Sequence, residues 1–141
     1  STKIRERLEE GDVKAASAML GYDYTLHGVV VAGNRLGRTI GFPTANMAIA
    51  QCVELENGVY RSQIEIDGLT YRAMSNVGVR PSVDGKTRLL ETHVFDFHGD
   101  LYGKVLSVTL VEKIRDERKF ASVAELRQQL EHDMEYCKSQ L

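Results

Sequence analysis

The stretch Gly58-Val59-Tyr60-Arg61-Ser62-Gln63-Ile64-Glu65-Ile66-Asp67-Gly68-Leu69-Thr70-Tyr71-Arg72-Ala73-Met74 decides the fold class of this 141-residue chain. Two runs rich in β-branched and aromatic residues flank the pair Asp67-Gly68, which suits the type I′ turn of a two-residue β-hairpin. Residues 58–66 and 69–74 are therefore predicted to pair as antiparallel strands.

Short β-type runs continue on both sides of this hairpin. Between residues 24 and 111, turn residues separate strand-sized segments with no amphipathic helix between them, which excludes a doubly wound parallel sheet. Residues 28–32, 89–97 and 105–111 are predicted to be further strands. About six consecutive strands joined by glycine-containing turns favour a small closed barrel over an open sheet with two exposed edges.

Both ends of the chain carry helical patterns. Residues 1–20 are predicted to form two short helices, because Asp12 can cap the second and Gly21 can end it. Ser122 and Glu125 suit a capping box at the start of a C-terminal helix. The apolar stripe of that helix consists of Leu126, Leu130, Met134, Cys137 and Leu141. The predicted fold is mainly β, a small antiparallel six-stranded β-barrel with a C-terminal helix packed on it and short N-terminal helices.

The composition is that of an ordinary globular domain. Hydrophobic residues make up 43% of the chain and charged residues 27%, and a chain of this length buries a core without disulfides. A net charge of −2 excludes the global basic field that draws proteins to nucleic acid or anionic lipid. There is no long apolar run and no signal-peptide pattern, and Cys52 and Cys137 lack CxxC spacing, so we expect reduced thiols and a cytoplasmic location.

The run Gly37-Arg38-Thr39-Ile40-Gly41-Phe42-Pro43-Thr44-Ala45-Asn46 is a candidate phosphate loop. Together with Gly33 it spaces three glycines four residues apart, so backbone N–H groups could surround an anion. Thr44 and Asn46 place a hydroxyl and an amide oxygen two residues apart, and such a pair can share one hard cation. Glycine-rich loops are also routine turns, and the pattern alone favours that interpretation. Because no GxxxxGK[ST] motif is present, a phosphate site here must be built differently.

A second polar segment, Asn76-Val77-Gly78-Val79-Arg80-Pro81-Ser82, precedes a predicted loop and the strand 89–97. Strand periodicity places Glu91, His93 and Phe95 on one face. A carboxylate directed with aromatic neighbours into a barrel mouth would be a usable general base, whereas periodicity alone favours a solvated strand glutamate. His93 can equally be structural, and the spacing of the four histidines indicates no zinc site.

Two further segments lie in predicted connections. Asp100-Leu101-Tyr102-Gly103 follows the strand 89–97, and Arg115-Asp116-Glu117-Arg118-Lys119-Phe120 precedes the C-terminal helix. Charge runs are most often solvated faces, which is the interpretation that the pattern favours. An aromatic residue at the end of alternating charges also suits a loop that folds over a planar ligand.

Taken in order, six of these segments resemble the riboflavin kinase family, specifically the C-terminal kinase module of bacterial bifunctional riboflavin kinase/FMN adenylyltransferases (FAD synthetases). They are residues 37–46, 58–60, 76–82, 91–93, 100–103 and 115–120. Ser82 departs from the threonine that is usual in the family but retains the hydroxyl. Ser1-Thr2-Lys3-Ile4-Arg5 resembles the tail of the motif that ends the adenylyltransferase module. The resemblance implies a residual helical segment from that module or its linker at 1–22 and a riboflavin kinase domain at 23–141.

The resemblance further implies ATP- and magnesium-dependent phosphorylation of the terminal ribityl hydroxyl of riboflavin to give FMN and ADP. FMN adenylyltransferase activity is not expected in this chain. The expected partners are riboflavin/FMN, ATP/ADP and, in the full-length enzyme, the adenylyltransferase module, with no nucleic acid and no membrane. The alternatives are a catalytically silent flavin- or nucleotide-binding regulatory module, which intact Thr44, Asn46 and Glu91 disfavour, and an oligonucleotide-binding barrel, which the absence of a basic stripe disfavours.

By family analogy, Glu91 is the catalytic base and Thr44 and Asn46 bind magnesium. Segments 78–88 and 99–104 are expected to be loops that become ordered when both ligands bind. The residues assigned to nucleotide binding are Gly37, Arg38, Gly41, Pro43, Thr44 and Asn46. The residues assigned to flavin binding are Asn76, Arg80, Arg115 and Phe120.

Overall fold

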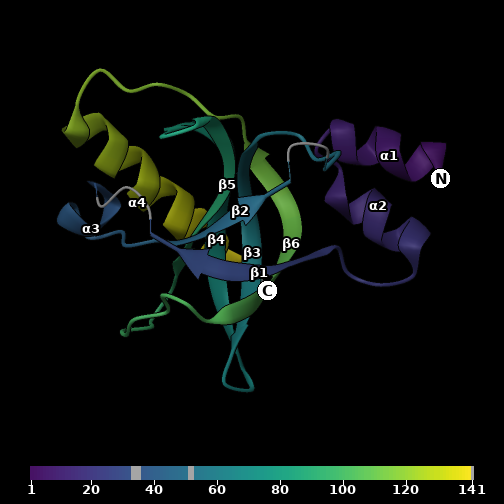
Figure 1. The fold of residues 1–141 in the computed structure, drawn as a ribbon, viewed down its shortest axis with the longest axis horizontal. Helices are drawn as coiled ribbons and strands as arrows, with labels where there is room; N and C mark the ends of the chain where they lie inside the picture. The colour runs from purple at the N-terminus through teal and green to yellow at the C-terminus, as the bar shows by residue number, and fades with distance from the viewer. Residues whose placement is uncertain (33–35, 51–52, 141) are drawn as a thin grey trace.

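A computed structural model describes residues 1–32, 36–50 and 53–140 of the chain (Figure 1). Gly33, Cys52 and Leu141, which the sequence analysis used, lie outside this description. In order, the elements of the described residues are α1 (Thr2–Glu9), α2 (Val13–Leu20), β1 (Thr25–Val31), α3 (Leu36–Thr39), β2 (Ala45–Ile49), β3 (Gly58–Ile66), β4 (Leu69–Ser82), β5 (Gly85–Val94), β6 (Val105–Arg115) and α4 (Val123–Ser139).

The strands close into an antiparallel barrel with the order β1-β2-β5-β4-β3-β6, so the predicted six-stranded barrel is confirmed. The predicted hairpin is β3 and β4, joined at Asp67 and Gly68. The φ angles of these two residues are 51° and 81°, and both signs are those that a type I′ turn requires. Closure pairs every strand on both sides, which removes the free edges of an open sheet.

The second hairpin is longer than predicted. β4 continues to Ser82 and β5 begins at Gly85, so the predicted loop before residue 89 is only a two-residue turn. Arg80 pairs with Thr87 and Pro81 with Lys86, which makes segment 78–88 a paired arm of the barrel rather than a loop. Proline is tolerated here because it lies near the end of the strand. β5 ends at Val94, before residue 97, and Asp96 then adopts a left-handed φ of 57°.

The side chains that point inward fill the barrel. Alternation along each strand gives one inner and one outer set. The large apolar side chains of the inner set that are at most 1% exposed are Tyr60, Ile64, Val77, Leu90, Val108 and Leu110. Three inner hydroxyls satisfy one another, because Ser75 Oγ lies 2.8 Å from Ser62 Oγ and 2.7 Å from Thr92 Oγ1. The barrel is therefore a packed core, and a ligand site must lie on its outside or at its rim.

The two N-terminal helices pack on the barrel, a point that the sequence left open. Asp12 caps α2 by accepting a hydrogen bond from the Ala15 N–H, and Gly21 ends the helix in the left-handed conformation. Val13 and Ala16 are buried in the same apolar cluster as Tyr60. Figure 1 shows α1 and α2 on the side of the barrel away from α4. These helices are thus part of the folded unit.

The C-terminal helix α4 packs on the outer face of β4, as predicted. Ser122 Oγ accepts a hydrogen bond from the Glu125 N–H at 3.2 Å, and Glu125 Oε2 accepts one from the Ala121 N–H at 3.2 Å. The apolar stripe of the helix contacts a second buried cluster on the outside of the barrel. The fully buried members of this cluster are Phe42, Met74, Phe95 and Cys137.

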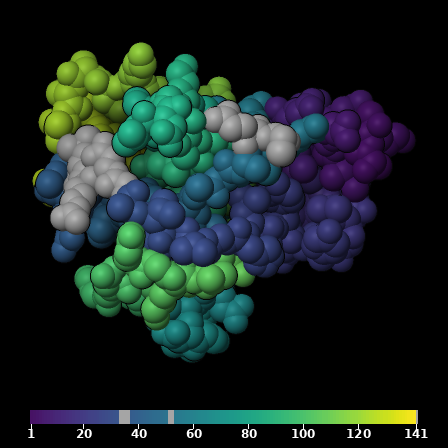
Figure 2. Space-filling view, viewed as in Figure 1, coloured from purple at the N-terminus to yellow at the C-terminus, as the bar shows by residue number. Residues whose placement is uncertain are grey.

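Figure 2 shows one face of the molecule in space-filling form. The purple and indigo N-terminal helices form one end, and the green segment that precedes β6 lies beside the teal hairpin of β3 and β4. Lys104 Nζ and Asp67 Oδ2, 3.4 Å apart, join that segment to the hairpin turn. Within the described residues, the helices all lack the length and apolar character needed to cross a membrane.

Candidate active site

One row of outward-facing residues, contributed by all six strands, brings predicted site residues together. Each member is directly paired with the next across the barrel wall. Residues that face each other in this way point to the same side of the sheet. In strand order the row consists of Val31, Asn46, Glu91, Asn76, Val59 and Arg115, and we call it the site row.

Glu91 does not point into the barrel mouth, and that part of the sequence interpretation is wrong. Its neighbours Leu90 and Thr92 are 0% and 1% exposed and face the interior, so the alternation of β5 directs Glu91 to the outside. The predicted sharing of one face by Glu91 and His93 is confirmed, because both line the same hollow. The carboxylate therefore stands on the outer wall, on the side covered by α4.

Two hollows meet at the site row. The helix-side hollow, of about 580 Å³, lies between the outer face of β4 and β5, the segment 115–120 and α4, and Asn76 and Glu91 line it. The loop-side hollow, of about 820 Å³, is lined by β1, β2 and residues 97–102, and Asn46 belongs to it. Thr44 lines both. A group bound at Thr44 would therefore stand at the junction of the two spaces.

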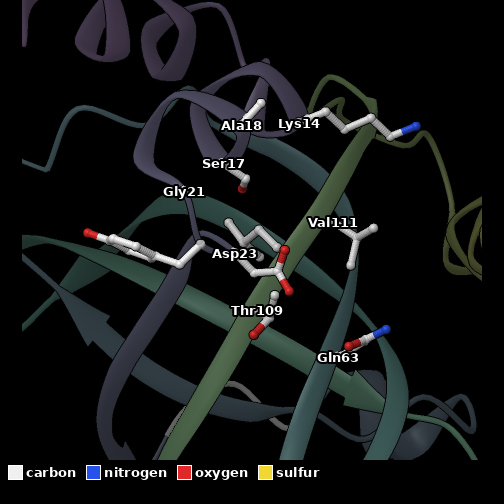
Figure 3. A pocket seen from close by; sticks show the side chains of 10 residues that line it. Lys14, Ser17, Ala18, Gly21, Asp23, Gln63, Thr109 and Val111 are labelled. Carbon is white, nitrogen blue, oxygen red and sulfur yellow. The ribbon is translucent and has the colours of Figure 1, made fainter.

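A third hollow lies apart from this region (Figure 3). It has a volume of about 470 Å³ and opens between α2 and β6, where Lys14, Ser17, Gln63 and Thr109 line it. None of the residues that the sequence assigned to a site is among its lining residues. The chemistry predicted from the sequence is therefore associated with the other two hollows.

Thr44 and Asn46 form an oxygen pair at the junction. Thr44 Oγ1 donates a hydrogen bond to Asn46 Oδ1 at 3.4 Å, and Asn46 is only 5% exposed. Hydroxyl and amide oxygens are ligands that magnesium accepts, usually together with phosphate oxygens and water. In the described ranges, no group of three or more His, Cys, Asp or Glu side chains could hold a metal. The pair fits a cation that gains its remaining ligands from a nucleotide.

Arg80 bridges two carboxylates beside this pair. Its Nη2 lies 2.7 Å from Glu91 Oε1 and 3.0 Å from Glu117 Oε2, so one guanidinium links β5 to the segment after β6. The bridge lies directly on Gly78, where a Cβ atom would collide with both Glu117 Oε2 and Arg80 Nη1. A side chain at this position would therefore displace the ends of these two flexible side chains and disturb the bridge.

Two acceptor atoms in this region are buried without a hydrogen-bond donor, Glu91 Oε1 and Asn76 Oδ1. Arg80 is within ion-pair distance of Glu91 Oε1, but its N–H groups do not meet hydrogen-bonding geometry there. Buried polar atoms are nearly always hydrogen-bonded in native proteins. Asn76 Oδ1 therefore has no hydrogen-bond partner, and Glu91 Oε1 has only its ion pair with Arg80, so both atoms can accept a hydrogen bond from a ligand.

His93 ties the strand of Glu91 to the segment of Thr44. Its Nδ1 lies 2.8 Å from the Pro43 carbonyl oxygen. A carbonyl only accepts, so Nδ1 carries the proton in the neutral ring. The ring also packs edge-to-face on Phe42 and Phe95, with centroids 5.1 and 5.7 Å away. Burial lowers the pKa of His93, although the bond to the Pro43 carbonyl opposes this. The structural interpretation of this histidine fits these contacts.

Arg115 lines the helix-side hollow, but its guanidinium group is hydrogen-bonded to another side chain of the protein. Its Nε and Nη2 donate to Asp133 Oδ2 at 3.0 and 2.8 Å, and Asp133 on α4 is 3% exposed. The Arg118 guanidinium lies 4.7 Å from the centre of the Phe120 ring, and that of Arg115 lies 5.9 Å from it. Asp133 was not among the predicted site residues, and its only signal in the sequence is a carboxylate beside the apolar stripe of the helix.

The residues assigned to nucleotide binding are divided between the two hollows. Arg38 and Pro43 line the loop-side hollow together with Thr44 and Asn46. Gly37 lines the helix-side hollow instead, and its carbonyl accepts a 2.6 Å hydrogen bond from the Phe42 N–H. Gly41 makes the turn between the two groups with a φ of 90°. The glycines thus shape the chain that carries Thr44.

Comparison with known proteins places this geometry in context. Residues 20–141 match the family model for flavokinase, described as riboflavin kinase. The bifunctional riboflavin kinase/FMN adenylyltransferase of Haemophilus influenzae is 42% identical over 140 residues, which cover 99% of this chain and 46% of that protein. The Bacillus subtilis protein of the same name is 37% identical over 137 residues, covering 94% and 43%. The chain spans less than half the length of these relatives.

Two solved structures resemble the chain. A Streptococcus pneumoniae protein, described as a macrolide-efflux protein, superposes with a TM-score of 0.91 at 40% identity, over all of this chain and 47% of that one. A riboflavin kinase from Trypanosoma brucei superposes with a TM-score of 0.59 at 22% identity, over 81% and 76% of the two chains. The second likeness is one of fold.

Proposed function

The chain belongs to the riboflavin kinase family, and from this premise we propose that it transfers the γ-phosphoryl group of ATP to the terminal ribityl hydroxyl of riboflavin, giving FMN and ADP. The observation that carries the proposal is the pairing of Glu91 with Asn46 in the site row, where Thr44 lines both hollows. Phosphoryl transfer depends mainly on positioning and on electrostatic stabilisation, and a base beside a cation site at such a junction supplies both.

The helix-side hollow is the proposed site of the flavin. Phe42, Met74 and Phe120 give it apolar walls, and Glu91 stands on its polar floor. Its volume of about 580 Å³ lies in the range of sites for small molecules. In this arrangement the ring system packs between the sheet and α4, and the ribityl chain extends towards Glu91. The carboxylate accepts a hydrogen bond from the terminal hydroxyl and takes its proton as the bond to phosphorus forms.

The loop-side hollow is the proposed site of ATP. Thr44 and Asn46 would hold magnesium at its inner end, and the cation would offset charge on the phosphate oxygens. Arg38 lines the same hollow and adds positive charge there. With the nucleotide on one side of Thr44 and the flavin on the other, the γ-phosphoryl group has only a short distance to travel. In this proposal both ligands bind to the same wall of the barrel.

We propose the kinase reaction alone for these 141 residues, without formation of FAD from FMN. The relatives carry two activities in their names and are about twice as long as this chain. In this proposal residues 1–22 represent the end of the adenylyltransferase module or its linker, and residues 23–141 form the kinase domain. The burial of Val13 and Ala16 on the barrel supports a stabilising role for the first segment.

The test is direct. The chain is incubated with riboflavin, ATP and Mg²⁺, and FMN and ADP are measured by chromatography. We expect equal amounts of both products. A catalytically silent flavin-binding module would quench riboflavin fluorescence without forming FMN, and that result would reject the proposed reaction. A parallel incubation with FMN and ATP is expected to give no FAD.

A further inference from the structure

Asn76 and Glu91 present a pair of unused acceptors on the floor of the helix-side hollow. Asn76 Oδ1 and Glu91 Oε1 are buried without a hydrogen bond, and the two residues are directly paired across β4 and β5. Directly opposed side chains have Cβ atoms about 5 Å apart. The two acceptors are therefore neighbours that face the same ligand space.

The barrel wall supplies no hydrogen bond to either acceptor. Their other neighbours in the site row are Val59, which has no donor side chain, and Asn46, whose amide makes no hydrogen bond to either of them. Arg80 forms ion pairs with both Glu91 and Glu117, and its Nη2 lies 2.7 Å from Glu91 Oε1, but it makes no hydrogen bond to that atom. The missing hydrogen-bond donors are thus two and adjacent, which is a pattern that hydroxyls on neighbouring carbons of a polyol can supply.

We propose that Asn76 is a specificity-determining residue, which accepts a hydrogen bond from the hydroxyl next to the one that is phosphorylated. Glu91 and Asn76 together then recognise a terminal 1,2-diol. The inference rests on the proposed function, because it takes the ribityl chain of riboflavin as the ligand. In riboflavin the second hydroxyl is the one at C4′, beside the reacting hydroxyl at C5′.

A second acceptor would fix the position of the ribityl chain along the site. Glu91 alone would accept any hydroxyl that reached it, so a polyol could slide by one carbon and present the wrong oxygen. A second acceptor at a fixed position gives the correct register one more hydrogen bond than a shifted one. A site built to hydrogen-bond a hydroxyl also discriminates strongly against analogues that lack it, because its own buried acceptor is then left unpaired.

The competing explanation is that Asn76 acts only through Glu91. Rotation of its amide by half a turn would direct Nδ2 towards the carboxylate, and Asn76 would then orient the base without contact to the ligand. The two explanations differ in one respect. A residue that reads the C4′ hydroxyl matters only when this hydroxyl is present, whereas a residue that orients the base matters for every acceptor.

The experiment compares kcat/KM of the wild type and of Asn76→Leu with riboflavin, 4′-deoxyriboflavin and 2′-deoxyriboflavin. On the wild type we expect the 4′-deoxy analogue to lose roughly 10- to 100-fold relative to riboflavin. Asn76→Leu should lose a similar factor with riboflavin and with the 2′-deoxy analogue, and nothing further with the 4′-deoxy analogue. Gln128→Leu, which replaces an exposed amide on α4, is the control and should behave like the wild type.

Equal losses of Asn76→Leu on riboflavin and on the 4′-deoxy analogue would overturn the inference, as would no loss on either. Asn76→Ala should reproduce the pattern of Asn76→Leu. It keeps the test decisive if the larger leucine side chain prevents the variant from folding. Failure of the wild type to form FMN from riboflavin would reject the proposed function, and this inference with it. FMN formation with equal losses on both acceptors would reject this inference alone.

Discussion

Asn46 of β2 and Glu91 of β5 are directly paired across the barrel wall. The amide proposed to hold magnesium and the carboxylate proposed to act as base therefore belong to one rung of one sheet. Their relative position is set by backbone hydrogen bonds rather than by a loop, and sites built on strands are held more closely than sites on loops. This pairing makes the role of each residue separately testable.

Glu91→Gln is expected to lower kcat for FMN formation roughly 10²- to 10⁴-fold, the usual contribution of a general base. The amide keeps the shape of the side chain, so dissociation constants for riboflavin and for ADP with Mg²⁺ should stay close to those of the wild type. Glu131→Gln removes the same charge from an exposed site on α4 and is the control. Full activity of Glu91→Gln would show that another group accepts the proton.

Thr44→Val should weaken Mg²⁺-dependent binding of ADP by roughly 10-fold or more, the loss typical even of residues that only support a metal ligand. Valine has nearly the shape of threonine but lacks the oxygen that lies 3.4 Å from Asn46 Oδ1. Thr44→Ser retains the oxygen and should bind as the wild type does. Calorimetry with and without EDTA measures the effect. If Thr44→Val has an unchanged Mg²⁺ requirement, Thr44 is not a ligand.

The hairpin of β3 and β4 and the helix α4 could be predicted because their signals are local. Asp67 and Gly68 specify the turn, and Ser122 and Glu125 specify the helix start. The site row could not be predicted in this way. It depends on the pairing of β2 with β5, which lie far apart in the sequence, and on a strand order that departs from chain order. Periodicity placed Glu91 and His93 on one face of the strand but did not show which face was the interior.

The resemblance supplied residues, and the structure supplied their surroundings. Arg115 shows the difference most clearly, since its segment was assigned to the flavin and its guanidinium is bound to Asp133. No local pattern connects a strand end to a helix residue that lies eighteen positions later. Whether Arg115 also contacts the flavin is a separate matter, and a charge-removal experiment addresses it.

Asp133→Ala is expected to reduce the free energy of unfolding by about 3–5 kcal/mol, because it leaves the Arg115 guanidinium without its buried partner. The double variant Arg115→Met/Asp133→Leu should recover most of this loss, since an apolar pair can replace a buried ion pair. Urea unfolding measures both values. If riboflavin KM returns together with stability, Arg115 only holds α4 in place. If stability returns while KM stays raised, the guanidinium binds the flavin.

Val13→Asp is expected to lower the melting temperature clearly, with a loss of roughly 2 kcal/mol or more from a buried carboxylate in an apolar cluster. Ala18→Asp, on the exposed side of the same helix, should have little effect. Differential scanning calorimetry compares the two. Equal stability of both variants would mean that α1 and α2 contribute nothing to the barrel.

Cys137 is expected to resist alkylation in the folded protein. Burial raises the pKa of its thiol to about 11, with Asp133 as the second cause, so the reactive thiolate is scarce at pH 8. In a Cys52→Ser background, mass spectrometry should show labelling by iodoacetamide only after denaturation. Rapid labelling under native conditions would mean that α4 leaves the barrel frequently.

Each member of the site row comes from a different strand, so the row is complete only when all the strands pair in the correct register. A slip of one residue in any strand pairing would turn one member into the barrel and its inner neighbour outward. Such a misaligned barrel could keep native secondary structure and compactness, yet it would be catalytically silent. Specific activity would then report the fraction of molecules in a preparation whose strands are in the correct register. Spectroscopic measures of strand content cannot report this fraction.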